Sequence, residues 1–435
     1  MAQGTMIFPP DFRWGTATAS FQVEGHTTNS DWWTWEQEPG RILHNQRSGQ
    51  ACNWWEDAEA DLDRAAALGN NAHRLSVEWS RIEPEPSVFD KEALNRYREI
   101  LQAMIARGLE PMVTLHHFSN PLWLAEKGDF TSGLVVDYFR RYVAQVVAAL
   151  GDLVSKWITI NEPMVYVYMR HMRGVYPATA TGYGTAFRVI RNLLRSHAAA
   201  YHAIKEGQPA AQVGIAKYVP VMQNRPGSNF LSTPWRRWLH YLFNDLWLNG
   251  MVSGRFAFPL GRQSIPHLKN SFDFLGVNYY SRWYISFPRL VTQDWGPDAV
   301  VSDGDFSEVY PAGMFSAIKW ANRFNKPIYI TENGLPDHDD DLRPGFILTH
   351  LREVWRAVSF CFPVMGYYHW TLVDNFEWDR GWTQRFGLYG LDETTGARFE
   401  RPSARLYKEI CQSRSVTSQM VQQYAPHLMP ALFPD

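Results

Sequence analysis

Two glutamates lie in short motifs that could carry acid–base or nucleophilic chemistry. Glu162 lies in WITINEP and Glu332 in IYITENG, and each follows an apolar run rich in β-branched residues and precedes a turn former, Pro163 or Asn333. Two carboxyl groups in one cleft can divide the work of acid and nucleophile, which is the arrangement that cleavage of a glycosidic bond uses. A helix or loop cap is the structural alternative for either glutamate alone. Their joint occurrence at two predicted strand ends favours the chemical interpretation.

The segments around these glutamates alternate between strand and helix patterns. Eight short β-rich runs are predicted as strands, near residues 12–16, 73–77, 112–115, 157–160, 213–216, 274–277, 328–331 and 364–368. Between them, segments such as 55–68 and 134–150 carry apolar residues at helical spacing. Eight strand–helix repeats favour a single-domain α/β fold, the (β/α)8 TIM barrel, whose catalytic groups lie at the carboxyl ends of its strands. An open doubly wound sheet is the rival, although WGTATAS lacks its usual glycine-rich phosphate turn.

Composition narrows the class of protein and its partners. The 435 residues are 45% hydrophobic and carry 42 Lys and Arg against 44 Asp and Glu, so the basic field that nucleic acid or an anionic membrane requires is lacking. The three cysteines are too few and too scattered for a disulfide framework or a zinc site. Without a signal-peptide pattern or an apolar run of about 18 residues, a cytoplasmic protein is predicted, and its oligomeric state stays open. The 19 tryptophans fit a large core or, less simply, a cleft that stacks sugar rings.

The domain organisation is predicted to be simple. No linker, charge block or repeat divides the chain, so we expect one catalytic barrel over residues 1–411. A C-terminal extension follows at 412–435, and its role is not assigned. The acidic run 337–341 lacks the spacing and the glycine of a calcium loop, so a solvated loop is expected there.

The motifs along the chain resemble those of glycoside hydrolase family 1, the family of β-glucosidases and β-galactosidases. They run in the family's order from FPPDFRWGTATASFQVEG through RLSVEWSRIEP, VTLHHFSNP, WITINEP, FLGVNYYS and IYITENG to YHWTLVDNFEWDRGWTQRFGLY. The resemblance covers about residues 8–410. It implies a retaining enzyme that needs no metal or organic cofactor, with Glu162 as acid/base and Glu332 as nucleophile.

The resemblance also implies roles for nine further residues. Arg74 and Tyr280 match groups that touch the nucleophile, and Asn278 belongs to the supporting shell. An aromatic platform beneath the sugar is implied for Trp370. Hydrogen bonds to that sugar are implied for Gln22, His117, Asn161, Glu377 and Trp378.

Several of these assignments agree with elementary physical chemistry. Arg74 has apolar neighbours on a predicted strand, and a buried guanidinium needs a carboxylate partner, for which Glu332 is the candidate. His116 and His117 are adjacent, so on an extended segment they face opposite ways and do not bind one metal together. One of the two is expected to face the cleft, and the family resemblance selects His117, so His116 is expected to be structural.

Glu377 lies between two aromatic residues in DNFEWD. Its carboxylate can accept hydrogen bonds from vicinal hydroxyls while a ring covers the apolar face of the sugar. This favours a hexose with free O4 and O6 over a 6-phosphoglycoside, whose phosphate a negative glutamate would repel. Phe118 and Ser119 replace a Trp-Asp pair that is frequent in the family, and Met164 replaces a bulkier residue, so the aglycone side is expected to have its own shape.

The expected activity is hydrolysis of terminal non-reducing β-D-glucosides, with galactosides or fucosides as further substrates, through a covalent glycosyl-enzyme intermediate. The two carboxyl groups should then lie about 5 to 5.5 Å apart, against about 6.5 to 9.5 Å in an inverting enzyme. Two other classes are considered. A carbohydrate-binding protein on an inactive barrel should lack one glutamate, and this sequence keeps both. A transglycosidase, which would let a sugar or alcohol intercept the intermediate, stays open. The expected partner is a small β-glycoside or oligosaccharide.

Overall fold

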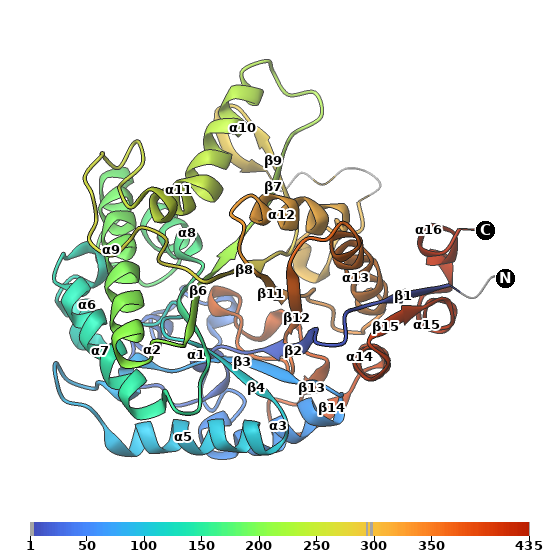
Figure 1. The fold of residues 1–435 in the computed structure, drawn as a ribbon, viewed down its shortest axis with the longest axis horizontal. Coiled ribbons are helices and arrows are strands. Elements are labelled where there is room, and N and C mark those ends of the chain that lie inside the picture. The colour runs from blue at the N-terminus through green and yellow to red at the C-terminus, as the bar shows by residue number, and fades with distance from the viewer. Residues whose placement is uncertain (1–3, 293–294, 296–298, 435) are drawn as a thin grey trace.

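Eight parallel strands close into a barrel at the centre of the molecule (Figure 1). The computed structural model describes residues 4–292, 295 and 299–434. The barrel strands are β2 (Arg13–Ala17), β3 (Ala72–Ser76), β4 (Glu110–Thr114), β5 (Lys156–Asn161), β6 (Gln212–Tyr218), β8 (Phe274–Asn278), β11 (Ile328–Asn333) and β12 (Val364–Trp370). Each predicted strand is confirmed with both ends within two residues. The closed ring, in which β12 pairs with β2, excludes the open doubly wound sheet.

The strands and their helices follow from the distribution of apolar residues. Every residue of β3, β5, β8 and β11 is buried, as expected for parallel strands that are covered on both faces. Helix α5 (Lys91–Ala106) begins at Asp90, whose carboxylate accepts hydrogen bonds from the backbone N–H groups of Glu92 and Ala93. It buries residues three or four positions apart, among them Tyr97 and Ile100.

The remaining helices surround the barrel or cap its loops. The longer ones are α3 (Trp54–Ala67), α7 (Val135–Leu150), α9 (Tyr183–Gly207), α10 (Ser232–His240), α11 (Leu246–Ser253), α12 (Ala312–Asn322), α13 (Arg343–Ser359) and α14 (Pro402–Ser413). The short ones are α1 (Ser20–Val23), α2 (Asp31–Glu36), α4 (Trp79–Ile82), α6 (Leu122–Glu126), α8 (Pro163–Tyr166), α15 (Ser418–Tyr424) and α16 (Met429–Leu432). Within the described part of the chain, none of them combines the length and apolarity needed to cross a bilayer.

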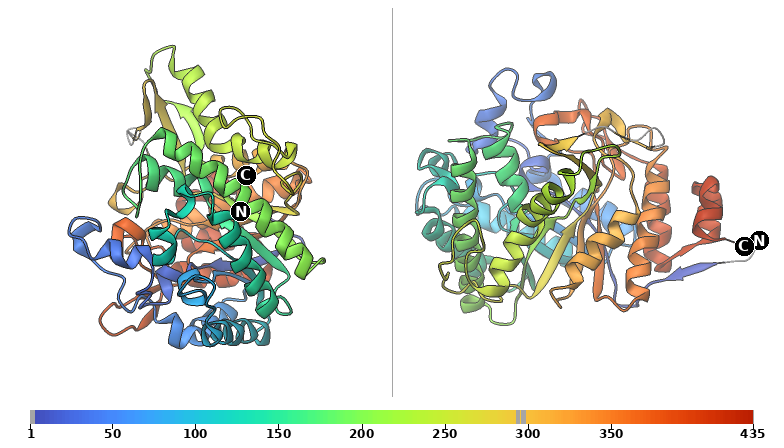
Figure 2. Two further views of the ribbon diagram at one scale, coloured as in Figure 1. Left: turned by 90° about the vertical axis from the view of Figure 1, so that its left-hand side faces the viewer. Right: turned by 90° about the horizontal axis from the view of Figure 1, so that it is seen from above.

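Three small sheets flank the barrel. Strand β9 (Arg282–Ser286) lies between β7 (Val221–Asn224) and β10 (Arg289–Thr292), and Figure 1 shows β7, β9 and α10 projecting together from one side of the barrel. Strand β13 (Tyr389–Leu391) pairs with β14 (Arg398–Glu400). Strands β1 (Thr5–Ile7) and β15 (Ser415–Thr417) pair antiparallel, so both chain ends lie on the same side of the molecule (Figure 2).

Candidate active site

A cavity of about 410 Å³ opens at the carboxyl ends of the barrel strands. Nine of the eleven predicted site residues line it: Gln22, His117, Asn161, Glu162, Tyr280, Glu332, Trp370, Glu377 and Trp378. The other two, Arg74 and Asn278, are fully buried and contact the lining residues from below. The structure therefore brings the whole predicted set together.

Glu332 lies in β11, one residue before the strand ends, and receives two strong hydrogen-bond donors. Arg74 Nη1 donates to its Oε1 at 2.5 Å, and the Tyr280 hydroxyl donates to its Oε2 at 2.7 Å. Burial and then the Glu332 charge raise the pKa of Tyr280 well above its ordinary value, so the phenol keeps the proton that it donates. A guanidinium and a phenol thus both donate to this one carboxylate, and the bond from the guanidinium is charge-assisted. The expected Arg74–Glu332 pair is confirmed.

The guanidinium of Arg74 is fixed on every side that carries a donor. Nε donates to Thr114 Oγ1 at 3.1 Å, and Nη1 also donates to the Thr331 carbonyl at 3.2 Å. Nη2 donates to Asn161 Oδ1 at 2.7 Å. Since β3 places this side chain inside the barrel, the cation cannot leave Glu332 without losing all of these bonds.

Glu162 has a different environment at the end of β5. Its backbone is left-handed, with φ 43° and ψ 59°, a conformation that costs a non-glycine residue roughly 1–3 kcal/mol and is often found at functional sites. Its side chain receives one amide donor, Asn278 Nδ2, at 2.8 Å from Oε1. Burial first, and then the charge of Glu332, raise the pKa of Glu162 to about 8. The carboxyl group is therefore protonated at neutral pH and can donate a proton.

Asn161 connects the two glutamates. Its Oδ1 accepts from Arg74 Nη2, which belongs to the Glu332 side, and from Asn278 Nδ2 at 3.2 Å, which belongs to the Glu162 side. Its Nδ2 lies 3.0 Å from His117 Nε2. An amide N–H donates, so we assign Nε2 as the acceptor and the ring proton to Nδ1. Burial keeps the pKa of His117 well below its ordinary value, and its Nδ1 is buried without a partner, available to a ligand hydroxyl.

The inner end of the cavity carries the remaining sugar-binding candidates. Gln22 Nε2 donates to Glu377 Oε2 at 3.0 Å and to the Phe376 carbonyl at 2.9 Å, while Gln22 Oε1 is buried without a partner. Trp378 stacks on Phe21 with ring centroids 5.8 Å apart. Burial raises the pKa of Glu377 to about 8, with the Asp379 and Glu332 charges adding to the effect. Glu377 is thus largely neutral at pH 7, so charge repulsion is a weaker argument against phosphate than the sequence suggested.

The structure also reveals residues that the sequence analysis missed. Lys217 in β6 is 1% exposed, donates to the Tyr218 carbonyl at 2.7 Å and acts electrostatically on Glu162. It follows the predicted fifth strand directly, which was a usable signal. The cavity is also lined by residues that received no role from the sequence: Tyr168, Met169, Arg173, Tyr176, Trp283, Trp295, Phe306, Asp379 and Arg380. Of these, Asp379 and Arg380 belong to the last of the family motifs, and the others lie outside the motifs.

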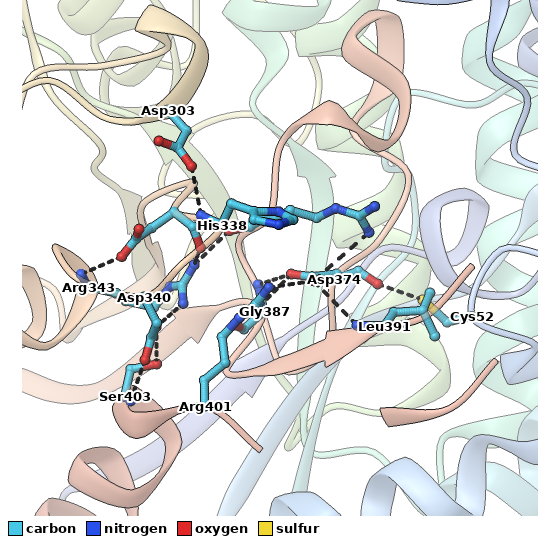
Figure 3. Close-up of polar contacts among 12 residues, drawn as sticks. Cys52, Asp303, His338, Asp340, Arg343, Asp374, Gly387, Leu391, Arg401 and Ser403 are labelled. Carbon is cyan, nitrogen blue, oxygen red and sulfur yellow. Dashed lines mark hydrogen bonds and ion pairs between the residues drawn. The ribbon is translucent and has the colours of Figure 1, made fainter. Parts of the chain in front are cut away.

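Two expectations concerned residues outside the cavity. His116 faces away from it, with Nε2 3.0 Å from Asn120 Oδ1 and its ring against Phe130, and is structural as expected. The acidic run 337–341 is not simply a solvated loop. Asp337 and Asp340 are buried because Asp337 accepts from the backbone at the start of α13 and Asp340 pairs with Arg343 (Figure 3).

A parallel barrel with two differently held carboxyl groups in a polar and aromatic cavity is the arrangement that glycoside hydrolysis uses. Comparison with known proteins agrees. The family model described as glycosyl hydrolase family 1 matches residues 4–416. The chain therefore belongs to glycosyl hydrolase family 1, a family of retaining β-glycosidases.

Individual relatives cover nearly the whole chain. The solved β-glycosidase of Pyrococcus horikoshii is 36% identical with a TM-score of 0.89, covering 97% of this chain and 98% of that one. The β-glucosidase of Thermotoga maritima, solved with glucoimidazole, is 29% identical with a TM-score of 0.87, covering 94% and 99%. A β-galactosidase of Sulfolobus acidocaldarius is 30% identical, covering 95% of this chain and 97% of that protein.

Proposed function

We propose that this β-glycosidase hydrolyses terminal non-reducing β-D-glucosides with retention, Glu332 serving as nucleophile and Glu162 as acid and base. The observation that carries the proposal is the opposite environment of the two carboxyl groups. Glu332 faces a guanidinium and a phenol donor, whereas burial and the Glu332 charge raise the pKa of Glu162 to about 8. One group is thereby held ready to attack and the other ready to donate a proton.

The first step makes a covalent intermediate. A Glu332 oxygen forms a bond to the anomeric carbon while the bond from that carbon to the aglycone oxygen breaks, and the Glu162 proton moves to the departing oxygen. Esterification removes the Glu332 charge, which is one of the causes of the raised pKa of Glu162. The pKa of Glu162 then falls and the group becomes a base.

The second step restores the enzyme. Glu162 takes a proton from water, the water oxygen bonds to the anomeric carbon, and the ester bond to Glu332 breaks. Two inversions retain the β configuration. We expect the carboxyl groups to be about 5 to 5.5 Å apart in the working enzyme, as this course requires.

The glycone preference rests on the inner cavity. Glu377, Gln22 and His117 present carboxyl, amide and imidazole groups, and two of them keep a buried polar atom without a partner. Such atoms gain hydrogen bonds when sugar hydroxyls enter. Trp370 and Trp378 supply flat apolar faces for the ring. The Thermotoga maritima relative, solved with glucoimidazole, supports a glucoside, while the Sulfolobus acidocaldarius β-galactosidase makes galactosides the first alternative to test.

The test combines a substrate panel with product analysis. Nitrophenyl β-D-glucoside, galactoside and fucoside are compared by kcat/KM, and the first-formed sugar is observed by proton NMR before mutarotation. We expect the glucoside to be the best substrate and the β-anomer to appear first. An α-anomer first would overturn the retaining course, and a better galactoside would overturn the glucoside preference alone.

A further inference from the structure

The segment that follows Glu162 contains a buried cation outside the cavity. Helix α8 continues into a π-helical turn, Val167–Met172, which carries Arg170 one turn after Tyr166. Arg170 is 1% exposed and Tyr166 is fully buried. Neither lines the cavity, so neither contacts a bound sugar.

Arg170 holds three elements at once. Its Nη1 donates to the Tyr166 hydroxyl at 2.8 Å and lies 3.4 Å from Asp129 Oδ2. Its Nη2 donates to Asp31 Oδ2, at the start of α2. The guanidinium carbon also lies 4.7 Å from the centroid of the Tyr166 ring. Burial acts to lower the pKa of Arg170, but the Asp31 charge and the other acidic neighbours outweigh it, so the cation persists.

Asn120 closes the network from the loop after β4. Its Nδ2 donates to the Tyr166 hydroxyl at 3.1 Å and to Asp31 Oδ2 at 3.0 Å, and its backbone N–H donates to Asp31 Oδ1 at 3.0 Å. The Tyr166 hydroxyl is therefore an acceptor from two sides. These contacts fix α8 against α2 and the loop after β4, with charge-assisted bonds inside a buried region.

The first turn of α8 in turn holds the backbone of Glu162. The Val165 and Tyr166 N–H groups donate to the Glu162 carbonyl at 2.9 and 3.0 Å, and the Glu162 N–H donates to the Ala216 carbonyl at 2.8 Å. A left-handed residue keeps its conformation only when its surroundings determine it. Through Tyr166, Arg170 joins this turn to Asp31 at the start of α2.

We propose that Arg170 is a positioning residue for Glu162, one that keeps the acid/base carboxyl group aimed at the departing oxygen. This inference rests on the acid/base role proposed for Glu162. It predicts that loss of Arg170 harms the steps that need proton transfer and spares the attack by Glu332, whose own contacts come from Arg74 and Tyr280.

The test measures leaving-group dependence in Arg170→Met. Kcat/KM for an alkyl β-glucoside, which needs the acid, should fall about 100-fold, whereas kcat/KM for 2,4-dinitrophenyl β-glucoside should fall less than about threefold. With the dinitrophenyl substrate kcat and KM should fall together, because the intermediate accumulates when the base is misplaced. Azide should then accelerate turnover, as it needs no base. Arg170→Lys should restore only part of the alkyl activity, because one ammonium cannot replace a planar fork that reaches Tyr166 and Asp31 together.

Arg343→Met is the matched control. Arg343 is also fully buried and pairs with Asp340 (Figure 3), but it belongs to α13 and is not among the residues that line the cavity. We expect this variant to lower the unfolding temperature without changing the ratio of the two substrates. An equal ratio in Arg170→Met and Arg343→Met would overturn the inference.

Two further variants separate the possible failures. If Arg170→Met does not fold, Tyr166→Phe removes the acceptor hydroxyl and keeps the ring, and it should shift the ratio in the same direction by roughly tenfold; an unchanged ratio there overturns the inference. Glu162→Ala tests the proposed function itself. Glu162→Ala should lose far more kcat/KM on the alkyl glucoside than on the dinitrophenyl glucoside. If it does and the Arg170 variants do not, only the inference about Arg170 fails. If Glu162→Ala loses activity equally on both substrates, the acid/base assignment fails.

Discussion

The carboxyl ends of β5 and β11 present the same residue type to the same cavity in different environments. At β11, Glu332 lies within the strand and faces a guanidinium and a phenol donor. At β5, Glu162 adopts a left-handed backbone and receives one neutral amide donor. The comparison shows that the division of labour between two glutamates is set by their partners and burial, since the side chains are chemically identical.

The two ends also differ in how they are supported. Arg74 reaches Glu332 across the barrel interior and is itself bound to strand residues, so the nucleophile side depends on the rigid centre of the fold. Glu162 depends on the α8 turn and on the loops that Arg170 connects. A perturbation of loop packing should therefore affect proton transfer before it affects the nucleophile.

Replacement of the nucleophile should have the largest effect. Glu332→Gln keeps the shape of the side chain but removes the attacking carboxylate, so kcat/KM should fall roughly 10⁴- to 10⁶-fold for every glycoside. Azide should not restore turnover, because this variant forms no covalent glycosyl-enzyme intermediate for azide to attack. Steady-state kinetics and an inhibitor-binding titration check this, and retained turnover with intact glucose binding would remove Glu332 from the role.

Removal of the acid/base should lower activity by an amount that depends on the leaving group of the substrate, whereas the nucleophile variant should lose activity on every substrate. Glu162→Ala should lower kcat/KM for alkyl glucosides roughly 10²- to 10⁴-fold and spare dinitrophenyl glucoside, which needs no protonation on departure. Azide should accelerate the latter. If all substrates lose activity equally and azide does nothing, β5 and β11 do not divide the work as proposed.

Arg74→Met tests the electrostatic half of the comparison. The variant leaves a buried carboxylate without its cation, so we expect kcat to fall roughly 10²- to 10³-fold. Breaking such a buried pair should also destabilise the fold by about 3–5 kcal/mol. Denaturant unfolding and steady-state kinetics measure the two effects, and an unchanged kcat would contradict the assigned role of Arg74.

The smallest effect is expected for Lys217→Met, which should shift the basic limb of the pH–rate profile relative to the native enzyme. Glu162 acts in its protonated form, and its pKa is about 8, so kcat/KM should decline as pH rises through that value. The Lys217 charge lowers the pKa of Glu162. Burial lowers the pKa of Lys217 itself to about 7, so much of Lys217 is already neutral at the pH at which Glu162 titrates. Loss of Lys217 should move the basic limb upward by less than about one pH unit; a downward move would show the opposite sign of coupling.

Much of the site was predictable because its residues stand at strand ends. Parallel strands deliver their carboxyl ends to one rim, so Glu162, Glu332 and His117 could be placed in one cleft from their positions after apolar runs. The resemblance supplied roles for residues such as Gln22 and Glu377. Lys217 was missed although it follows a predicted strand, and Arg170 carried no motif at all. Long-range partners such as Asp31 and Asp129 cannot be identified from spacing, because they come from loops far apart in the chain.

The sequence by itself determined the alternation of strands and helices, the barrel that this alternation closes, and the identity of the two carboxyl groups at its rim. Local patterns suffice for that, since strand and helix periods are properties of neighbouring residues. The tertiary structure decided which glutamate faces a cation and which is left with an amide, because burial and partner distance arise only when distant segments pack. The pKa of about 8 for Glu162 is a property of that packing and of no single motif.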